Sequence, residues 1–364
     1  MSNLSHLLAA YRKHPAVEKI VQTLKHPTPP VRLQLNGLIG AQESFVFAGT
    51  VLHALPSNLH VFIANSKEEA AYRHNDLEGL LAAENVHFFP DSFKRPAFFD
   101  DLNPTQMLQR SEMINKITTA PGGSRDEAPP GGREAGFASG KAGDFGQNIH
   151  PQTGPQGSFS PPPGGPAGII VTYPEALFEK VVKPEVLVQS RIEVKKGEKL
   201  DVDWVIEVLV EYGFERADFV YEPGQFSVRG GIIDLFSYGN DLPYRIELFD
   251  DEVETIRVFD PLTQLSQRNL SSVSIVPNLN TRFRQDQKVS LFRILPADTV
   301  IWVRDFQFLL DRLQYCFERA EQFAARITAL DSAELREIFR DRAFLFPGDV
   351  VEDIAGRPVI YLGH

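Results

Sequence analysis

The sequence contains one cysteine, Cys316, among its 364 residues. This scarcity excludes a scaffold of disulfide bonds and a zinc site built on cysteine ligands. The first residues contain no cationic stretch followed by an apolar run, so we predict no secretion signal. No window reaches the roughly 18 apolar residues that are needed to span a bilayer. These absences together predict a soluble, cytoplasmic protein without a membrane partner.

An excess of positive charge is also missing, because the formal net charge is -11. Non-specific binding to nucleic acid depends on Lys and Arg that neutralise phosphates, so the composition disfavours it but leaves room for a local basic site. Hydrophobic residues make up 43% of the chain, which is sufficient for a real core. The length predicts two or three domains.

The clearest break in composition lies at residues 121–168, which contain 13 Gly and 9 Pro in 48 positions. A segment of this kind buries too little apolar surface to offset the conformational entropy lost on folding. We therefore predict a disordered insertion, either a simple linker or a docking segment.

The residues on both sides of the insertion indicate one parallel α/β domain formed by residues 1–120 and 169–188. Helix and strand signals alternate here, and Ser66 followed by Glu69 predicts a capping box. A continuous apolar run at 169–172 is typical of a central parallel strand. We predict strands at 31–35, 60–64, 86–89 and 169–172, and helices at 4–25, from about 43 to 55, after Ser66 and from Pro174.

Residues 189–276 indicate an α+β module with an antiparallel sheet. Asp201 to Asp203 open a predicted helix and Gly213 closes it. Four alternating runs follow, at 218–228, 232–236, 244–249 and 253–259. The acidic run from Asp250 to Glu252 predicts a tight turn between the last two strands, with a weak cation site as the alternative.

Residues 277–364 predict a strand at 299–303 and a long helical region from about 306 to 339. The chain stops on a strand-like sequence at 359–364, without a closing helix. We therefore expect a partial third subdomain in a chain that was cut from a longer protein.

A degenerate phosphate loop lies between the first predicted strand and the following helix. The pattern G-x-x-x-x-G-K-[ST] begins at Gly37 and ends at Ser44, and Gly40 lies within it, but Gln42 replaces the second glycine and Glu43 replaces the lysine. The lysine would supply positive charge to a phosphate, and Glu43 reverses that charge. One like-charge contact at about 4 Å costs on the order of 4 kcal/mol near a protein surface. We therefore expect this helix start to be structural.

No other catalytic pattern is present in the sequence. The chain lacks H-E-x-x-H, G-x-S-x-G and a Cys/His cluster, and its nine histidines are scattered. We therefore expect no catalytic residue, metal or cofactor in this segment.

Two sequence blocks carry a specific resemblance. Residues 221–236 read YEPGQFSVRGGIIDLF, and residues 243–254 read PYRIELFDDEVE before RVFDP at 257–261. These blocks resemble the UvrA-interaction domain shared by the excision nuclease subunit UvrB and the transcription-repair coupling factors. The resemblance implies an α/β fold with three parts: a degenerate RecA-like or P-loop-like parallel-sheet domain, an α+β UvrA-interaction domain with an antiparallel sheet, and the partial third subdomain.

Two departures favour the coupling factors over UvrB. UvrB carries an intact phosphate loop, and it also has a tyrosine-rich hairpin that clamps DNA, for which residues 90–112 leave no room. The resemblance implies a module that recruits UvrA in transcription-coupled nucleotide excision repair. In that family, ATP, Mg²⁺, RNA polymerase and double-stranded DNA are bound by regions beyond this chain.

The resemblance also implies which residues contact UvrA, namely Arg216, Arg229, Arg245 and the aromatic Phe226. Ser227 stands where the UvrB pattern has another arginine. Alternation along the strand puts Ser227 and Arg229 on one face and Phe226 on the other, so Phe226 is also a candidate for the core. The module has 9 basic and 17 acidic residues, so two outward arginines would stand out. The alternative is that each arginine makes an ordinary surface pair.

Two other functions stay open at this point. Besides the UvrA-recruiting module, the chain could be a UvrB-like excision-repair ATPase with an unusual loop. The other alternative is a stand-alone regulator that binds UvrA without any motor. ATP hydrolysis that depends on Glu43 would indicate the first of these. The sequence that follows residue 364 would decide the second.

Overall fold

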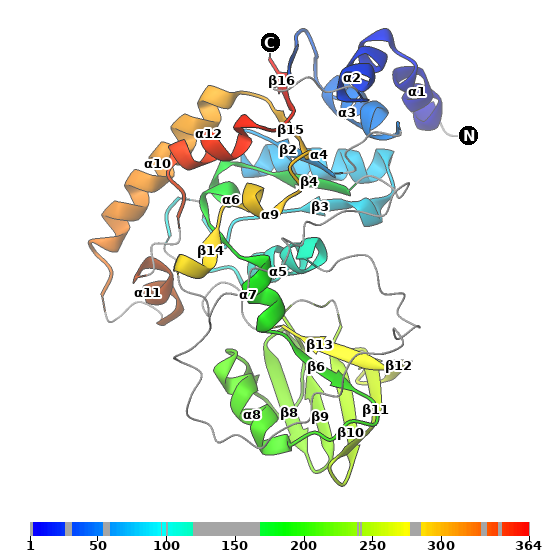
Figure 1. Cartoon of the computed structure of the whole chain (residues 1–364), viewed down its shortest axis with the longest axis vertical. Helices are drawn as coiled ribbons and strands as arrows, with labels where there is room; N and C mark the ends of the chain where they lie inside the picture. Colours follow the sequence, from blue (N-terminus) through cyan, green and yellow to red (C-terminus); the bar gives the residue numbers. More distant parts are fainter. Residues whose placement is uncertain are drawn as a thin grey trace.

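The computed structural model describes residues 3–25, 31–53, 59–95, 97–99, 101–118, 168–238, 240, 242–276, 285–328, 333–340 and 344–363. One parallel and one antiparallel sheet, each with its own core, dominate this part of the chain, as Figure 1 shows. The prediction of a mixed α/β fold with both kinds of sheet is confirmed. Within the described ranges, no helix has the length and apolar character that crossing a membrane requires.

The first sheet has six strands, and all neighbouring strands run parallel. Their order is β1 (Arg32–Leu35), β16 (Val359–Leu362), β15 (Val300–Val303), β2 (Leu59–Ile63), β4 (Gly168–Thr172) and β3 (Val86–Phe88). As predicted, the apolar run of β4 is an inner strand. Residues 277–364, expected to form a partial third subdomain, contribute β15 and β16 to the same sheet as residues 32–63.

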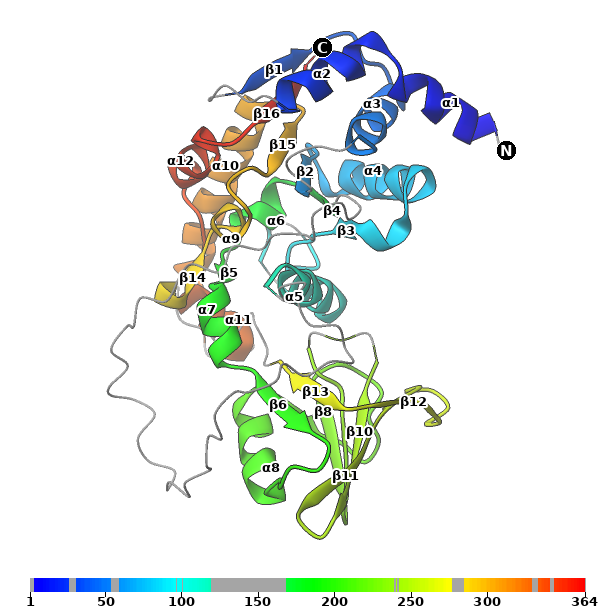
Figure 2. The same ribbon diagram turned by 45° about the vertical axis from the view of Figure 1, so that its right-hand side comes forward.

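Helices lie on both sides of the parallel sheet, and Figure 2 shows them from a second angle. The helix α4 packs on β3 and β4, whereas α10 packs on α6 and α12. The helices are α1 (Asn3–Arg12), α2 (Pro15–Lys25), α3 (Gln42–Val51), α4 (Lys67–Leu80), α5 (Pro104–Thr118), α6 (Pro174–Phe178), α7 (Pro184–Gln189), α9 (Leu291–Ile294), α10 (Phe306–Ala324), α11 (Ala333–Arg340) and α12 (Pro347–Ala355). Short 3₁₀ turns at Ala83–Asn85 and Gln285–Gln287 and a two-stranded pair, β5 (Val181–Val182) with β14 (Lys288–Val289), complete this part.

Three local predictions need correction. The single helix expected at 4–25 is two helices, because Pro15 begins α2 and proline is favoured at a first helical position. The helical region expected at 306–339 is α10 and α11, with residues 329–332 outside the described ranges. Ser66 caps α4 as predicted, but the Glu69 carboxylate accepts from the backbone of Asn65 and not from that of Ser66.

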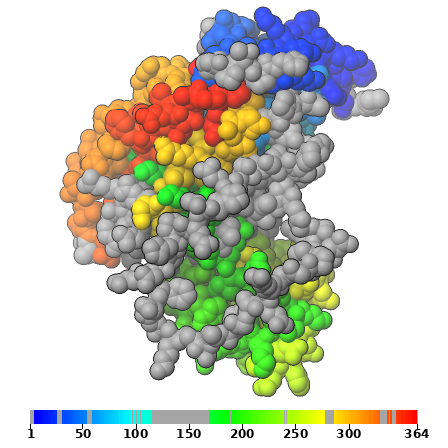
Figure 3. All heavy atoms as spheres, viewed as in Figure 1, coloured from blue at the N-terminus to red at the C-terminus, as the bar shows by residue number. Residues whose placement is uncertain are grey.

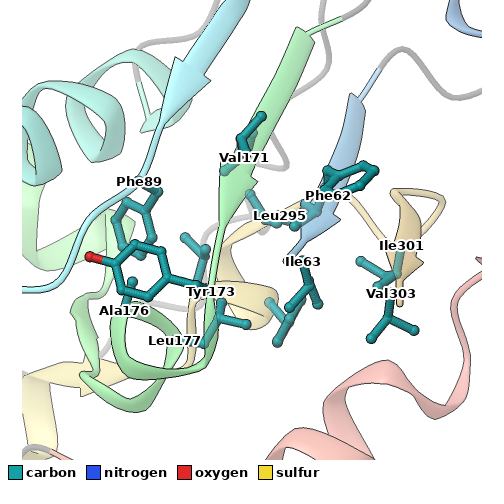
Figure 4. Close-up of a cluster of buried hydrophobic side chains, with 14 of the residues drawn as sticks. Phe62, Ile63, Phe89, Val171, Tyr173, Ala176, Leu177, Leu295, Ile301 and Val303 are labelled. Atoms are coloured by element: carbon teal, nitrogen blue, oxygen red, sulfur yellow. The ribbon is translucent and has the colours of Figure 1, made fainter. Parts of the chain in front are cut away.

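The core of the parallel-sheet unit is aromatic and aliphatic. Figure 4 shows Phe62, Val171, Ile301 and Val303 from neighbouring strands in one buried cluster. Trp302 on β15 is fully buried, and its indole N–H donates to Nδ1 of His60 at 3.2 Å. Of the predicted insertion, only Gly168 falls within the described ranges, where it begins β4.

The second sheet is antiparallel except where β7 pairs with β8. Its strand order is β12 (Ser266–Leu270), β11 (Glu252–Phe259), β10 (Tyr244–Phe249), β9 (Ile232–Leu235), β8 (Gln225–Arg229) and β7 (Glu215–Arg216), with a separate ribbon of β6 (Ile192–Lys195) and β13 (Ser272–Ile275). The strand predicted at 218–228 is shorter, because a turn at Glu222–Gly224 interrupts it. Gly224 has φ of 85°, and a Cβ there would lie 2.4 Å from the hydroxyl oxygen of Tyr238.

The helix α8 (Val202–Glu211) covers one face of the antiparallel sheet, as Figure 1 shows. Asp201 caps its start, and Gly213 follows its end with φ of 81°, as the sequence predicts. Val205 and Leu209 are fully buried with Phe226 and Ile233 in a core separate from that of the parallel sheet. The opposite face of this sheet carries Arg229 and Arg245.

Candidate docking surface and the phosphate loop

The degenerate phosphate loop joins β1 to α3, the position that the sequence predicts. Gly37 and Gly40 have φ of 77° and 59°, a backbone region that glycine adopts without steric cost. The loop therefore keeps the local geometry of a tight strand-to-helix connection although two residues of the pattern are replaced.

The carboxylate of Glu43 lies inside the protein and is only 2% exposed. Its Oε2 accepts a hydrogen bond from Nη2 of Arg73 on α4 at 2.7 Å, and its Oε1 lies 3.9 Å from Nη2 of Arg304, which follows β15. Arg73 also donates to the carbonyl of Gly40 at 3.2 Å and to Oγ of Ser44 at 3.1 Å. The charge reversal at Glu43 is thus compensated by two arginines.

The two remaining polar groups of the loop are also used internally. The Gln42 side-chain oxygen accepts from the backbone N–H of Ile39 at 2.9 Å. The Ser44 hydroxyl donates to Oδ2 of Asp76 at 3.0 Å. The residues at the second-glycine, lysine and hydroxyl positions of the pattern therefore all bond to other groups of this chain.

A second polar cluster lies beyond the carboxyl ends of β3 and β4, and its partners are also internal. The Tyr173 hydroxyl donates a short hydrogen bond to Asp91, which also pairs with Lys67 at 3.1 Å. Arg110 is buried and donates to the carbonyls of Pro90, Ala176 and Glu179. Burial raises the pKa of the Tyr173 hydroxyl and of the Glu179 carboxyl. This cluster ties loop 89–93 to α6.

No group of three His, Cys, Asp or Glu with metal-ligating geometry occurs in the described ranges. The acidic run at 250–252 forms the predicted turn, in which Asp250 has φ of 59°. Asp251 pairs with Lys199 at 2.7 Å, and this hydrogen bond lowers the pKa of Asp251. An ordinary hairpin turn with a lysine partner therefore accounts for this segment.

A row of polar side chains crosses the antiparallel sheet on the face opposite α8. Strand pairing aligns Ser227 with Asp234, Asp234 with Arg245, and Arg245 with Arg257. Arg229 lies two residues from Ser227 and therefore on the same face. The fold thus brings Arg229 and Arg245 together, as the alternation in the sequence predicts.

Asp234 holds both arginines. Its side chain is fully buried, and its Oδ2 accepts from Nη2 of Arg229 at 2.6 Å. Arg245 donates to Oδ1 through Nε at 2.7 Å and to Oδ2 through Nη2 at 2.9 Å, and the hydrogen bond raises the pKa of Arg245. The side chains of Arg229 and Arg245 are 41% and 18% exposed. Two guanidinium groups share one carboxylate, so this triad carries one excess positive charge.

Exposed apolar side chains flank the two arginines on two loops. Phe219 and Tyr221 are 47% and 50% exposed, and the guanidinium of Arg229 lies 4.9 Å from the centre of the Phe219 ring. Leu262 and Leu265 are 85% and 69% exposed. The side chain of Gln264 joins the loops by donating to the carbonyl of Val220 at 3.2 Å. We call Phe219, Tyr221, Arg229, Arg245, Leu262 and Leu265 the docking face.

Sequence reasoning missed the four apolar members of the docking face. Phe219 and Tyr221 fall inside a predicted strand, where alternation made them look like ordinary strand residues. The usable signal was the run Glu222-Pro223-Gly224 directly after them, which is typical of a turn and so predicts that the preceding aromatics lie in a loop.

Two other predicted contact residues lie elsewhere. Phe226 is fully buried in the core beneath α8, so its side chain has no exposed surface with which to contact a partner. Arg216 is exposed on the edge strand β7. Its partner in the strand register is Phe226, so Arg216 does not belong to the row that contains Arg229 and Arg245. Of the four predicted residues, the structure brings together only Arg229 and Arg245.

The antiparallel-sheet unit matches a known family model. Residues 192–280 match the UvrB interaction domain. This stretch contains the docking face, α8 and every strand of the antiparallel sheet from β8 to β12.

Relatives extend the similarity beyond this domain. A transcription-repair-coupling factor of Bacillus subtilis is 40% identical over 256 residues, which is 70% of this chain and 18% of that protein. The Escherichia coli factor is 32% identical over 139 residues, 38% of this chain and 12% of that protein. The UvrABC system protein B of Vibrio vulnificus is 41% identical over 111 residues, 30% of this chain and 16% of that protein. The chain is therefore similar to part of the coupling factors and of this UvrABC system protein, and it spans less than a fifth of the length of these relatives.

Proposed function

We propose that this chain recruits UvrA through its docking face, as a module of a transcription-repair coupling factor in transcription-coupled nucleotide excision repair. The observation that carries the proposal is the match of residues 192–280 to the UvrB interaction domain, because this stretch holds the whole docking face. The partner surface on UvrA would bind Arg229 and Arg245 and cover Phe219 and Tyr221.

The chemistry of the docking face supports a protein partner. Arginine and aromatic residues dominate binding energy at protein interfaces, where they combine apolar area with directed hydrogen bonds. The guanidinium groups are oriented by Asp234, so little side-chain entropy is lost when they bind. One positive charge is left over in the triad, and it would attract a carboxylate of UvrA.

We also propose how the work is divided along the chain. Residues 1–120 and 169–188 act as a degenerate RecA-like scaffold interrupted by the insertion at 121–168, residues 189–276 bind UvrA, and residues 277–364 complete the UvrB-like part. The separate core of the antiparallel sheet supports this division. ATP, Mg²⁺, RNA polymerase and DNA would bind parts of a longer cytoplasmic protein, and the internally bonded phosphate loop supports the absence of ATP hydrolysis from this segment.

The proposal is tested by titrating purified UvrA against the full chain and against the variant Arg229→Glu. We expect the wild-type chain to bind and the variant to bind at least tenfold more weakly while its circular dichroism stays unchanged. The matched control is Arg268→Glu, which makes the same charge change on β12, where the residue is exposed and lies outside the docking face. Equal binding of Arg229→Glu and wild type would contradict the proposed site.

The same preparation distinguishes the UvrB-like ATPase. A steady-state ATP hydrolysis assay of the wild-type chain should give no activity above the buffer background. Hydrolysis that is lost in Glu43→Ala would contradict the proposal and favour an ATPase.

A further inference from the structure

The degenerate phosphate loop connects β1 to α3 through two glycines with positive φ, and its polar side chains bond within the chain. The two residues that replace the pattern, Gln42 and Glu43, both place a side-chain oxygen where the loop and its neighbours offer donors. In an intact loop, backbone N–H groups and a lysine face the oxygen atoms of a bound phosphate. Here the N–H of Ile39 and the guanidinium of Arg73 face oxygen atoms of this chain.

We infer that the carboxylate of Glu43, assisted by Gln42, is an internal anion that takes the place of a bound phosphate and locks the loop to α4 and β15. In this arrangement Arg73 and Arg304 form the cationic side of an anion site, and its occupant is covalently part of the protein. The parallel-sheet unit then keeps one conformation, because no nucleotide binds at the loop to change it.

The contacts of Arg73 and Arg304 connect the phosphate loop to α3, α4 and the end of β15. Arg73 on α4 bonds to the loop carbonyl of Gly40 and to Glu43 on α3, so one side chain fixes three elements. Arg304 follows the inner strand β15 and pairs with Glu69 at the start of α4 as well as lying close to Glu43. A bound phosphate would have to displace a carboxylate that is 2% exposed and hydrogen-bonded.

The test uses thermal unfolding of the full chain read by the fluorescence of Trp302, which is fully buried in the parallel-sheet unit. The chain has two tryptophans, and Trp204 is 46% exposed, so Trp204→Phe leaves Trp302 as the single probe. In this background, inorganic phosphate should not change the melting temperature relative to chloride of equal ionic strength.

The variant Glu43→Gln should melt about 5 °C lower, because it removes the buried carboxylate nearest to Arg73 and leaves Asp76, at 3.7 Å, as the carboxylate paired with that guanidinium. Inorganic phosphate should restore at least half of this loss by displacing the uncharged amide and pairing with Arg73 and Arg304. The matched control is Glu175→Gln, which breaks another pair between a buried glutamate and an arginine, with Arg312 at 2.6 Å, and should gain nothing from phosphate. Equal stabilisation of wild type and Glu43→Gln by phosphate, or no restoration, would overturn the inference.

A double variant keeps the test decisive if Glu43→Gln does not fold. Glu43→Gln with Arg73→Gln removes the carboxylate together with its main partner. We expect this chain to fold, to melt above the single variant and to ignore phosphate. A double variant that is no more stable than Glu43→Gln would contradict an internal ion pair. These readouts do not involve UvrA, so they stand or fall separately from the proposed function.

Discussion

The phosphate loop and the docking face use arginine in opposite ways. At the loop, Arg73 and Arg304 face the carboxylates of Glu43, Glu69 and Asp76, so positive charge is fully compensated inside the chain. At the docking face, Arg229 and Arg245 share the single carboxylate of Asp234. Three carboxylates around two arginines leave no positive charge at the loop, whereas one carboxylate shared by two arginines orients them and leaves positive charge for a partner.

The two regions also differ in their apolar surroundings. The loop adjoins a core in which Phe47, Phe62 and Trp302 are buried. The docking face instead exposes Phe219, Tyr221 and two leucines. Figure 3 shows how the two units of the chain occupy opposite ends of the molecule in one view, with the antiparallel-sheet unit in green and yellow-green at the bottom.

The largest expected effect is on stability and concerns Phe226. Replacing Phe226 by alanine should lower the free energy of unfolding of the antiparallel-sheet unit by about 3–5 kcal/mol, because the ring is fully buried. Differential scanning calorimetry measures this change. The control Phe219→Ala removes a half-exposed ring and should cost less than about 1 kcal/mol. Similar losses for both variants would contradict the separation of core and docking face.

The next effect is on binding and concerns Arg245. Replacing Arg245 by glutamate puts a second carboxylate beside buried Asp234, so it should weaken UvrA binding about a hundredfold, or about 2.7 kcal/mol. Isothermal titration calorimetry with the full chain measures the affinity. The comparison is Arg73→Gln at the phosphate loop, which should leave UvrA affinity within about twofold. Equal losses would mean that the two arginine sites do not differ in function.

Much of this fold follows from sequence, and the exceptions have physical causes. The apolar run of β4 and the caps of α8 depend on local propensity, so their positions are predictable. The joining of β15 and β16 to the first sheet depends on pairing across hundreds of residues, for which a single sequence contains no local signal. The alternation within each strand predicts that Arg229 and Arg245 point outward. That Asp234 binds both arginines depends on the register between strands, which the alternation does not contain.

The third effect is a difference between the two units in how their stability depends on pH. Burial lowers the pKa of His60 to about 3 from an ordinary value of 6.5. The folded state keeps His60 neutral while the unfolded chain takes up a proton below pH 6.5, so this group destabilises the fold as pH falls. The limiting slope is about 1.4 kcal/mol per pH unit for one proton. Residues 189–276 contain no histidine, so their unfolding lacks this dependence.

Unfolding of the parallel-sheet unit at several pH values, read by Trp302 in the Trp204→Phe background, checks this expectation. The variant His60→Gln should have a flatter pH dependence between pH 6.5 and about 3, the interval between the unfolded and folded pKa values of His60. An unchanged slope in His60→Gln would show that another group controls the acid response.

The smallest effect concerns the apolar rim of the docking face. Replacing Tyr221 by alanine should weaken UvrA binding about fivefold, or about 1 kcal/mol, because the half-exposed ring contributes contact area at low entropic cost. Titration calorimetry measures the affinity. The control is Tyr72→Ala on α4, which removes a more exposed tyrosine from the other unit. A loss of affinity in Tyr72→Ala that matches Tyr221→Ala would place the contact surface elsewhere.

The contrast between the two regions is tested most directly by hydrogen–deuterium exchange of the full chain with and without UvrA. We predict that UvrA slows exchange in residues 217–229 and 244–265, which carry the docking face, and leaves residues 36–44 of the phosphate loop unchanged. Protection of residues 36–44, or no protection between 217 and 265, would contradict the account.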